Sequence, residues 1–301
     1  MDTVLQTLDL SKAYGTRVAV DHLNLAVERG EIFGFLGPNG AGKTTTIRMA
    51  LGLIAPTSGR VAVLGHDVSR QGADVLPRVG ALVESPALYA YMSGRDNLRA
   101  FAAPLGGLSP RRLDEVLETV GLTGRQRDRV ATYSLGMKQR LGVAAALLYD
   151  PDLLILDEPA NGLDPAGIVE MRDLLRRQAR EGKTVFISSH VLAEVQQICD
   201  RVAIINQGRL VRQAPVAALL ASHGEFTILL DRADDALRLL RTQPWGRTAR
   251  TRAGGLITPS PSGRGRELVQ FLVQNGFWPD SLAPRQQTLE EIFLELTGGA
   301  N

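Results

Sequence analysis

One short run limits the possible folds of this chain of 301 residues more than any other feature. The run spans residues 37–44, reads GPNGAGKT, and fits the pattern G-x-x-x-x-G-K-(S/T) at every fixed position. The apolar segment Ile32–Leu36 before it predicts a buried strand, and Thr45–Leu53 after it predicts a helix. A glycine-rich turn between a strand and a helix indicates an α/β fold with a phosphate-binding loop.

The residue types of this run suit a bound polyphosphate. Glycines let the backbone curl until successive N–H groups point at phosphate oxygens, and the helix N-terminus adds positive potential. Lys43 is expected to reach the β- and γ-phosphates, and the Thr44 hydroxyl to ligate Mg²⁺. The alternative is a glycine-rich turn with an incidental lysine. The residues predicted to contact a nucleotide here are Gly37, Pro38, Asn39, Gly40, Ala41, Gly42, Lys43, Thr44 and Thr45.

Two carboxylates end a second apolar run. Leu153–Leu156 is apolar at successive positions, as in a strand that is covered on both faces of a parallel sheet, and Asp157 and Glu158 follow it. Side chains alternate along a strand, so the two carboxylates point different ways. One can enter the Mg²⁺ shell while the other faces the γ-phosphate, where a water must be oriented. The alternative is a strand that runs into a helix cap.

The order of elements predicts two domains. Up to about residue 215, short β-rich runs alternate with helical patterns, and residues 90–150 are helical throughout, which indicates a helical subdomain inserted into the α/β core. From about residue 222 the composition changes, and short strands alternate with helices in a small α+β domain of βαββαβ type. The predicted strands are Leu5–Leu10, Val18–Val27, Ile32–Leu36, Arg60–Leu64, Val79–Val83, Leu153–Asp157, Thr184–Ser188, a hairpin across Val202–Val211, Glu225–Leu230 and Gly255–Pro259; the predicted C-terminal helices are Ala233–Arg241, Arg266–Asn275 and Leu289–Thr297.

Composition excludes several classes of protein. Hydrophobic residues make up 44% and charged residues 22%, which excludes a largely disordered chain. Cys199 is the single cysteine, so neither an intrachain disulfide nor a thiolate metal cluster can form. The net charge of +2 gives no reason to expect nucleic acid as the main partner. No apolar run approaches the roughly 18–20 residues that span a bilayer.

Further motifs resemble those of ATP-binding cassette proteins. The run of residues 133–140, YSLGMKQR, resembles the signature sequence of that family, and Asp150-Pro151 stands where the family usually has it. Residues 161–164, NGLD, match its D-loop, and His190 after two serines matches its switch histidine. Tyr14 matches the aromatic residue that stacks on adenine. The order and spacing of these motifs agree with the family over residues 3–215.

The resemblance implies a fold and a set of roles. It implies a P-loop NTPase core with a parallel sheet, an N-terminal antiparallel β-subdomain and a helical subdomain within residues 1–220, followed by a small C-terminal α+β domain at 222–301. Asp157 is then a Mg²⁺ ligand and Glu158 the general base or water-polarising carboxylate. His190 contacts the γ-phosphate and helps to hold Glu158. The cofactors are ATP and Mg²⁺.

The resemblance also implies a head-to-tail homodimer with two nucleotides sandwiched between the subunits. Ser134 and Gly136, at a helix N-terminus, face the nucleotide bound by the other subunit, and Asp164 lies at the same interface. Simpler interpretations stay open for several of these residues. Tyr14 can be a core aromatic residue, Asp164 an N-cap before Pro165, His190 a partly buried histidine and Glu158 a second structural acid.

Two departures from the family pattern matter. The signature has Leu135 and Met137 where glycine and glutamine are usual, but Ser134 and Gly136 remain. The Q-loop glutamine is expected at the end of Val79–Val83, and this chain has Glu84 there. We hypothesise that Glu84 ligates Mg²⁺ directly or through water and couples the nucleotide state to the helical subdomain. The alternative is an ordinary surface glutamate.

Two further segments indicate which branch of the family this chain resembles. They are the segment after Glu84 and the C-terminal run of residues 288–294, TLEEIFL. They are similar to the ATPase subunits of bacterial antibiotic and lantibiotic exporters, of the bacitracin-export and daunorubicin-resistance type. This implies efflux of a drug, antibiotic or peptide through a separate integral membrane permease, at the cytoplasmic face of the membrane. The main alternative is a soluble ATPase of the same family that acts on nucleic acid or ribosomes, and no nucleic acid is expected. A module that binds nucleotide but barely hydrolyses it, and a P-loop kinase, are weaker alternatives.

Overall fold

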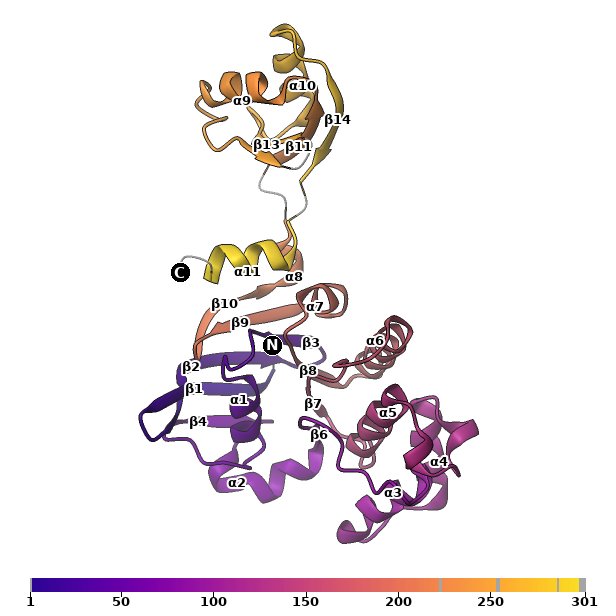
Figure 1. The fold of residues 1–301 in the computed structure, drawn as a ribbon. Helices are drawn as coiled ribbons and strands as arrows, with labels where there is room; N and C mark the ends of the chain where they lie inside the picture. Colours follow the sequence, from indigo (N-terminus) through magenta and orange to yellow (C-terminus); the bar gives the residue numbers. More distant parts are fainter. Residues whose placement is uncertain (1, 222–223, 253–254, 286, 298–301) are drawn as a thin grey trace. The chain divides into compact units, whose positions relative to one another are not determined.

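The structure is a computed structural model, and it describes residues 2–221, 224–252, 255–285 and 287–297 (Figure 1). The described chain divides into two compact units. The first holds residues up to Val216 and also residues 295–297, and the second holds Ala217–Leu294. Each unit has its own hydrophobic core and its own sheet or sheets.

An antiparallel sheet of four strands begins the first unit, in the order β2-β1-β4-β5. This is the predicted N-terminal β-subdomain. β1 and β2 form a long hairpin that turns between Tyr14 and Arg17, which pair with each other across the two strands. The strands are β1 (Thr3–Tyr14), β2 (Arg17–Glu28), β4 (Ser58–Val63) and β5 (His66–Asp67).

A sheet of six strands, in the order β10-β9-β3-β8-β7-β6, forms the centre of the first unit. β9, β3, β8, β7 and β6 are parallel, and β10 is antiparallel to β9 at one edge. Every residue of β3, β7 and β8 is buried, which explains why these strands read as continuous apolar runs. The bounds are β3 (Ile32–Leu36), β6 (Val79–Leu82), β7 (Leu153–Asp157), β8 (Thr184–Ser189), β9 (Arg201–Asn206) and β10 (Arg209–Pro215).

Helix α1 packs between the two sheets, in contact with β2, β4 and β7 (Figure 1). Its side chains Ile47 and Met49 join a core that also includes Phe33 and Phe35 of β3 and Phe186 of β8. The Phe33 and Phe186 rings stack with their centroids 5.8 Å apart. This core fixes the carboxyl ends of the central strands relative to the start of α1. The helix spans Lys43–Ala50.

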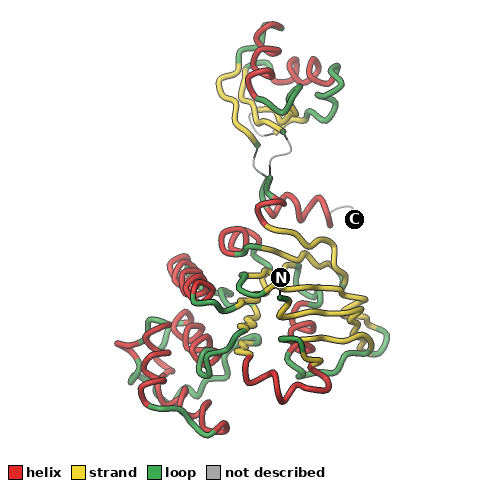
Figure 2. The backbone as a smooth tube through the Cα atoms, turned by 180° about the vertical axis from the view of Figure 1, so that it is seen from behind, coloured by secondary structure: helices red, strands yellow, loops and turns green. Residues whose placement is uncertain are grey.

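The predicted helical subdomain is present. α3, α4 and α5 contact one another, and α5 also contacts β6, which connects the subdomain to the central sheet (Figures 1 and 2). Between residues 90 and 150 the structure shows no strand element, as expected. The helices of the first unit not yet named are α2 (Val68–Val75), α3 (Gly94–Ala102), α4 (Pro110–Thr119), α5 (Leu135–Ala146), α6 (Pro165–Arg180) and α7 (Leu192–Ile198).

The second unit has the predicted βαββαβ order. Its four strands form one antiparallel sheet in the order β12-β13-β11-β14, and its core includes Phe226, Ile228, Leu240, Leu268 and Leu272. Strand β14 has a proline at each end, so its sequence did not indicate a strand. The sheet tolerates these prolines because β14 is an edge strand. The elements are α8 (Val216–Leu219), β11 (Glu225–Leu230), α9 (Ala233–Arg241), β12 (Arg250–Arg252), β13 (Gly255–Pro259), α10 (Gly265–Gln274), β14 (Pro279–Pro284) and α11 (Leu289–Thr297).

A chain of ion pairs links this sheet to the start of α11. Arg285, with a side chain only 5% exposed, donates to both Glu225 and Glu291. Arg250 donates to both carboxylate oxygens of Glu225, at 2.9 and 3.1 Å, and Arg252 pairs with Glu291. Burial alone raises the pKa of Glu225, but its hydrogen bonds and charge contacts with Arg250 and Arg285 outweigh burial and lower that pKa. Arg285 is thus the shared partner of two carboxylates.

Replacement of Arg285 by methionine should destabilise the second unit by about 2–4 kcal/mol, because both carboxylates lose their buried partner. Both tryptophans of the chain, Trp245 and Trp278, lie in this unit, so fluorescence-detected urea unfolding reports on it. Arg238→Met is the matched control, since Arg238 makes an exposed ion pair with Asp235 and should cost less than about 1 kcal/mol. Equal unfolding midpoints for the two variants would contradict the assignment.

Candidate active site

The glycine-rich loop closes tightly between β3 and α1. Gly42 has φ 103°, and a Cβ there would lie 2.5 Å from the carbonyl oxygen of Ala19 in β2. A Cβ at Gly37 would lie 2.6 Å from the carbonyl oxygen of Ile205 in β9. Both positions therefore require glycine, and the neighbouring strands determine the shape of the loop.

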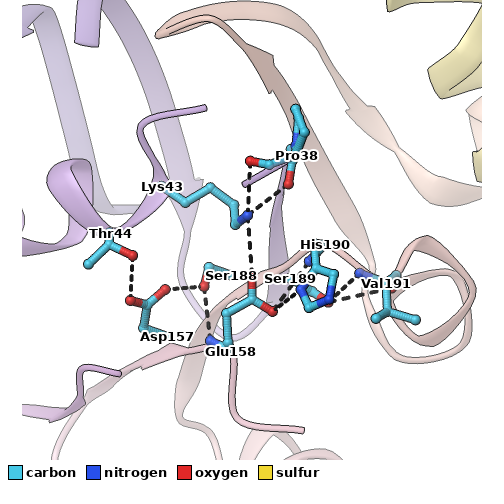
Figure 3. A network of polar contacts seen from close by, with 10 residues as sticks. Pro38, Lys43, Thr44, Asp157, Glu158, Ser188, Ser189, His190 and Val191 are labelled. Atoms are coloured by element: carbon cyan, nitrogen blue, oxygen red, sulfur yellow. Dashed lines mark hydrogen bonds and ion pairs between the residues drawn. The ribbon is translucent and has the colours of Figure 1, made fainter. Parts of the chain in front are cut away.

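Lys43 connects the loop to the acidic motif (Figure 3). Its Nζ donates to the carbonyl oxygens of Gly37 at 2.7 Å and Pro38 at 3.4 Å, and lies 3.2 Å from Oε1 of Glu158. The side chain is only 6% exposed. The structure thus brings together two residues that the sequence separates by more than a hundred positions, as the family resemblance requires.

Asp157 and Thr44 form the second part of the site. Thr44 Oγ1 donates to Oδ2 of Asp157 at 2.8 Å, and the Ser188 hydroxyl donates to Oδ1 (Figure 3). A hydroxyl and a carboxylate are hard oxygen donors, which are the ligands that Mg²⁺ takes in proteins. In the described part of the chain no group of three or more His, Cys, Asp or Glu side chains is placed to hold a metal ion. These two donors fit a Mg²⁺ ion that also binds the nucleotide phosphates.

Glu158 turns away from Asp157, as the strand alternation predicts. Its Oε2 contacts Nδ1 of His190 at 2.8 Å, and its backbone N–H donates to the Ser188 hydroxyl at 3.0 Å. Its φ is 48°, a left-handed conformation that costs a non-glycine residue about 1–2 kcal/mol. The structure sustains this strain at the position where the carboxylate meets both Lys43 and His190.

A cavity of about 380 Å³ opens over the loop. Its lining includes Tyr14, Arg17, Lys43, Thr44 and Glu158, so the predicted adenine-stacking and phosphate-binding residues face one space. Tyr14 is 49% exposed and is not a core residue. Lys12 Nζ lies 5.2 Å from the centroid of its ring. This cavity has the size and the mixture of aromatic and cationic groups that a nucleotide needs.

A second and slightly larger cavity, of about 420 Å³, lies between α6 and α7. It shares Glu158 and His190 with the site, but most of its lining is apolar, including Ile168, Met171 and Val195. Glu194 also lines it, and burial raises the pKa of this carboxyl group. A triphosphate requires cations and backbone N–H groups, and the lining of the first cavity fits this requirement better.

Glu84 lies apart from the other predicted metal ligands. Its Oε1 accepts a hydrogen bond from Nη2 of Arg48 at 2.6 Å, and 61% of its side chain is exposed. Among the described contacts none joins Glu84 to Thr44 or Asp157. Arg48 stands four residues after Thr44 on α1, so the two side chains lie on the same face of that helix. Metal ligation by Glu84 therefore stays a prediction.

Ser134 and Asp164 both cap helices within the protomer. Ser134 accepts a hydrogen bond from the Met137 N–H at the start of α5, and Asp164 accepts one from the Gly167 N–H at the start of α6. Ser134 is exposed, and a Cβ at Gly136 would meet no atom closer than 3.7 Å. In the described residues, neither Ser134 nor Gly136 contacts Lys43 or the residues bound to it. Both remain available at the surface for a second subunit.

Ser188 and Arg48 are polar residues of the site that were not predicted. Ser188 connects Asp157 and the backbone of Glu158, and its signal was a serine that ends an otherwise apolar strand. Arg48 pairs with Glu84, and its only signal was the four-residue spacing from Thr44. Neither pattern is specific until the fold is known, because serines and arginines at such positions are common.

Comparison with known proteins agrees with this geometry. The profile of the family described as "ABC transporter" matches residues 20–161. The bacitracin transport ATP-binding protein BcrA of Bacillus licheniformis is 43% identical over 302 residues, which cover 99% of each chain. This chain belongs to the ABC transporter ATP-binding proteins. It is therefore an ATPase of that family, with the predicted P-loop NTPase core.

Two further relatives extend this comparison. The daunorubicin resistance ATP-binding protein DrrA3 of Streptomyces coeruleorubidus is 36% identical to the ABC ATPase described here, over 99% of this chain and 96% of its own. The solved structure of cbiO1 from Clostridium perfringens, described as part of the ABC transporter complex cbiONQ, has a TM-score of 0.67 and 28% identity, and covers 81% of this chain and 96% of its own. Within the described residues, the ABC ATPase has no helix with the length and hydropathy of a membrane span.

Replacement of Ser188 by alanine should lower kcat of ATP hydrolysis about tenfold and leave ATP affinity within about twofold, because loss of its two hydrogen bonds, to Asp157 and Glu158, costs about 1–2 kcal/mol in total. The variant leaves Oδ1 of Asp157 and the N–H of Glu158 without their shared partner. Steady-state kinetics and calorimetric ATP titration separate the two parameters. Ser189→Ala is the control, since Ser189 contacts only Val191 in this network. A Ser188→Ala variant with the kcat of this control would refute the positioning role.

Proposed function

We propose that this ATPase drives export of a drug, antibiotic or peptide through a separate integral membrane permease, from the cytoplasmic face of the membrane. The observation that carries the mechanism is the contact of Lys43 and His190 with the two oxygens of Glu158, beside the Thr44–Asp157 pair. The export assignment is supported by full-length similarity to a bacitracin transport ATP-binding protein and a daunorubicin resistance ATP-binding protein. We further propose that residues 1–220 form the ATPase domain and residues 222–301 an accessory domain.

The residues of the site divide the work of ATP hydrolysis. Tyr14 stacks on adenine, and the N–H groups of the loop bind phosphate oxygens. Lys43 exchanges its contacts with the Gly37 and Pro38 carbonyl oxygens and with Glu158 for contacts with the β- and γ-phosphates. Thr44 and Asp157 would hold Mg²⁺, and the ion would neutralise charge that develops on the phosphates.

Release of Glu158 from Lys43 frees its carboxylate for water. Glu158 Oε1 then accepts a proton from the water that attacks the γ-phosphorus, and the bond from this phosphorus to the bridging oxygen breaks, so that ADP leaves. His190 holds Oε2 during this step. The backbone N–H of Glu158 stays bound to Ser188, which keeps the carboxylate aimed at the cavity. ATP binding itself thereby prepares the general base, because the phosphates compete for the same lysine.

We also propose that a second copy completes the site. Ser134 and Gly136 at the start of α5 present a helix N-terminus to the surface, where it can bind the γ-phosphate held by a partner subunit. Asp164 is expected at the same interface of a head-to-tail homodimer. The helical subdomain, entered through Glu84, is the segment that we expect to transmit closure of this dimer to the permease.

Replacement of Glu158 by glutamine should reduce ATP turnover at least a hundredfold, because an amide cannot accept the proton of the attacking water. ATP should still bind, and the ATP-bound dimer should accumulate. Phosphate release measures turnover, and size-exclusion chromatography with ATP measures the dimer. The control is Glu170→Gln, an exposed glutamate of α6 that pairs with Arg140. Wild-type turnover in Glu158→Gln would exclude Glu158 as the base.

Glu84→Gln should change the Mg²⁺ dependence of the ATPase. If Glu84 ligates the ion, the amide variant needs about tenfold more Mg²⁺ for half-maximal turnover, since a neutral ligand attracts the cation less strongly. It should also bind ATP more tightly in EDTA, because a negative charge near the phosphates is gone. Glu118→Gln, an exposed glutamate of α4, is the control. An unchanged Mg²⁺ dependence would leave Glu84 as a surface residue paired with Arg48.

Identification of the proteins that bind this ATPase tests the proposed role in transport. Affinity capture from native membranes, with mass spectrometry of the bound proteins, should recover an integral membrane protein in stoichiometric amount. Recovery of ribosomes or DNA at moderate salt, without a membrane protein, would instead favour the alternative of an ATPase that acts on nucleic acid.

A further inference from the structure

An arginine side chain lies at the phosphate loop. Arg17 begins β2, and its side chain lines the cavity that also contains Tyr14, Lys43 and Thr44. Its Nη2 lies 3.8 Å from the position that a Cβ on Gly40 would occupy. The guanidinium therefore lies beside the middle of the loop.

In the part of the chain that the structure describes, no acidic side chain pairs with this group. Among the residues that the structure describes, the Arg17 guanidinium has no hydrogen-bond or ion-pair partner, whereas Arg209 pairs with Asp21 and Arg29 with Asp2. Glu158 is the acidic residue that lines the same cavity, and it is already paired with Lys43 and His190.

Arg17 is exposed, and the positive groups around it favour an anion as its partner. The loop N–H groups, the N-terminus of α1 and Lys43 all create positive potential there. The Arg17 guanidinium is a fourth positive source, which adds repulsion without a ligand and attraction once phosphates are present. Arginine is also the side chain whose planar fork donates two parallel hydrogen bonds to a phosphate.

The β1–β2 hairpin aims Arg17 and Tyr14 at the same ligand. The two residues pair directly across the hairpin, and the side chains of such a pair lie on the same face. One short turn thus presents an aromatic ring and a guanidinium to one cavity. We propose that Arg17 binds the polyphosphate chain of the nucleotide and acts as a second basic residue beside Lys43. This proposal rests on the ATP-binding function proposed above.

The test separates the phosphate chain from the adenine. Affinities for ATP and for inorganic tripolyphosphate are measured by calorimetry in Arg17→Gln, Arg17→Lys and Tyr14→Ala. Arg17→Gln should weaken both ligands about tenfold, which corresponds to one charge-assisted hydrogen-bonded contact. Arg17→Lys should recover part of this loss, because it restores the charge without the fork. Tyr14→Ala should weaken ATP and leave tripolyphosphate unchanged.

The control is Arg60→Gln, an exposed arginine of β4 in the same antiparallel sheet, outside the lining of the cavity. It should bind both ligands as the wild type does. Arg17→Gln with wild-type affinities, or with a loss for ATP but none for tripolyphosphate, would overturn the assignment while the ATPase function stands. A wild-type protein that binds no ATP would instead overturn the proposed function and this inference with it.

Discussion

The parallel pairing of β3, β8 and β7 is the constraint on which the site depends. The register sets Leu36 beside Ser189 and Asp157 beside Ser188, so all three strands end at one level. The loop after β3, the carboxylates after β7 and His190 after β8 therefore meet at one edge of the sheet, as expected of ligand sites in open α/β sheets. A slip of one residue in any of these pairings would move the side chains of that strand to the opposite face of the sheet and would separate Lys43 from Glu158.

The polar groups at this edge satisfy one another before any ligand is present. Lys43 binds the loop carbonyl oxygens and Glu158, and Thr44 and Ser188 bind Asp157. Each of these groups is buried or nearly so, and buried polar groups are costly without partners. The nucleotide must replace these internal contacts with its own. In the mechanism that we propose, nucleotide binding and preparation of the Glu158 carboxylate are one event, because both depend on Lys43.

The sequence predicted those elements for which a short stretch of residues carries a distinctive pattern of its own. The continuous apolar runs gave β3, β7 and β8, and the glycine-rich run gave the loop, because burial on both faces and a positive φ each demand particular residue types. Strand β14 was not predicted, since its terminal prolines resemble a loop until its edge position is known. Nor did any pattern pair Arg48 with Glu84. That contact joins α1 to the segment after β6, and only the packing of the two determines it.

The chemistry of this protein was thus determined by its sequence, and the geometry by its tertiary structure. The identity and order of the loop, the acidic pair, the signature run and the histidine are enough to indicate a nucleotide-hydrolysing fold, because each motif has a fixed chemical requirement. Only the tertiary structure decided three contacts. Oε1 of Glu158 lies beside Lys43, Ser188 connects Asp157 to Glu158, and Arg17 lies beside the loop. These contacts join residues of different elements, and no local pattern in a chain specifies the strand register that brings such elements together.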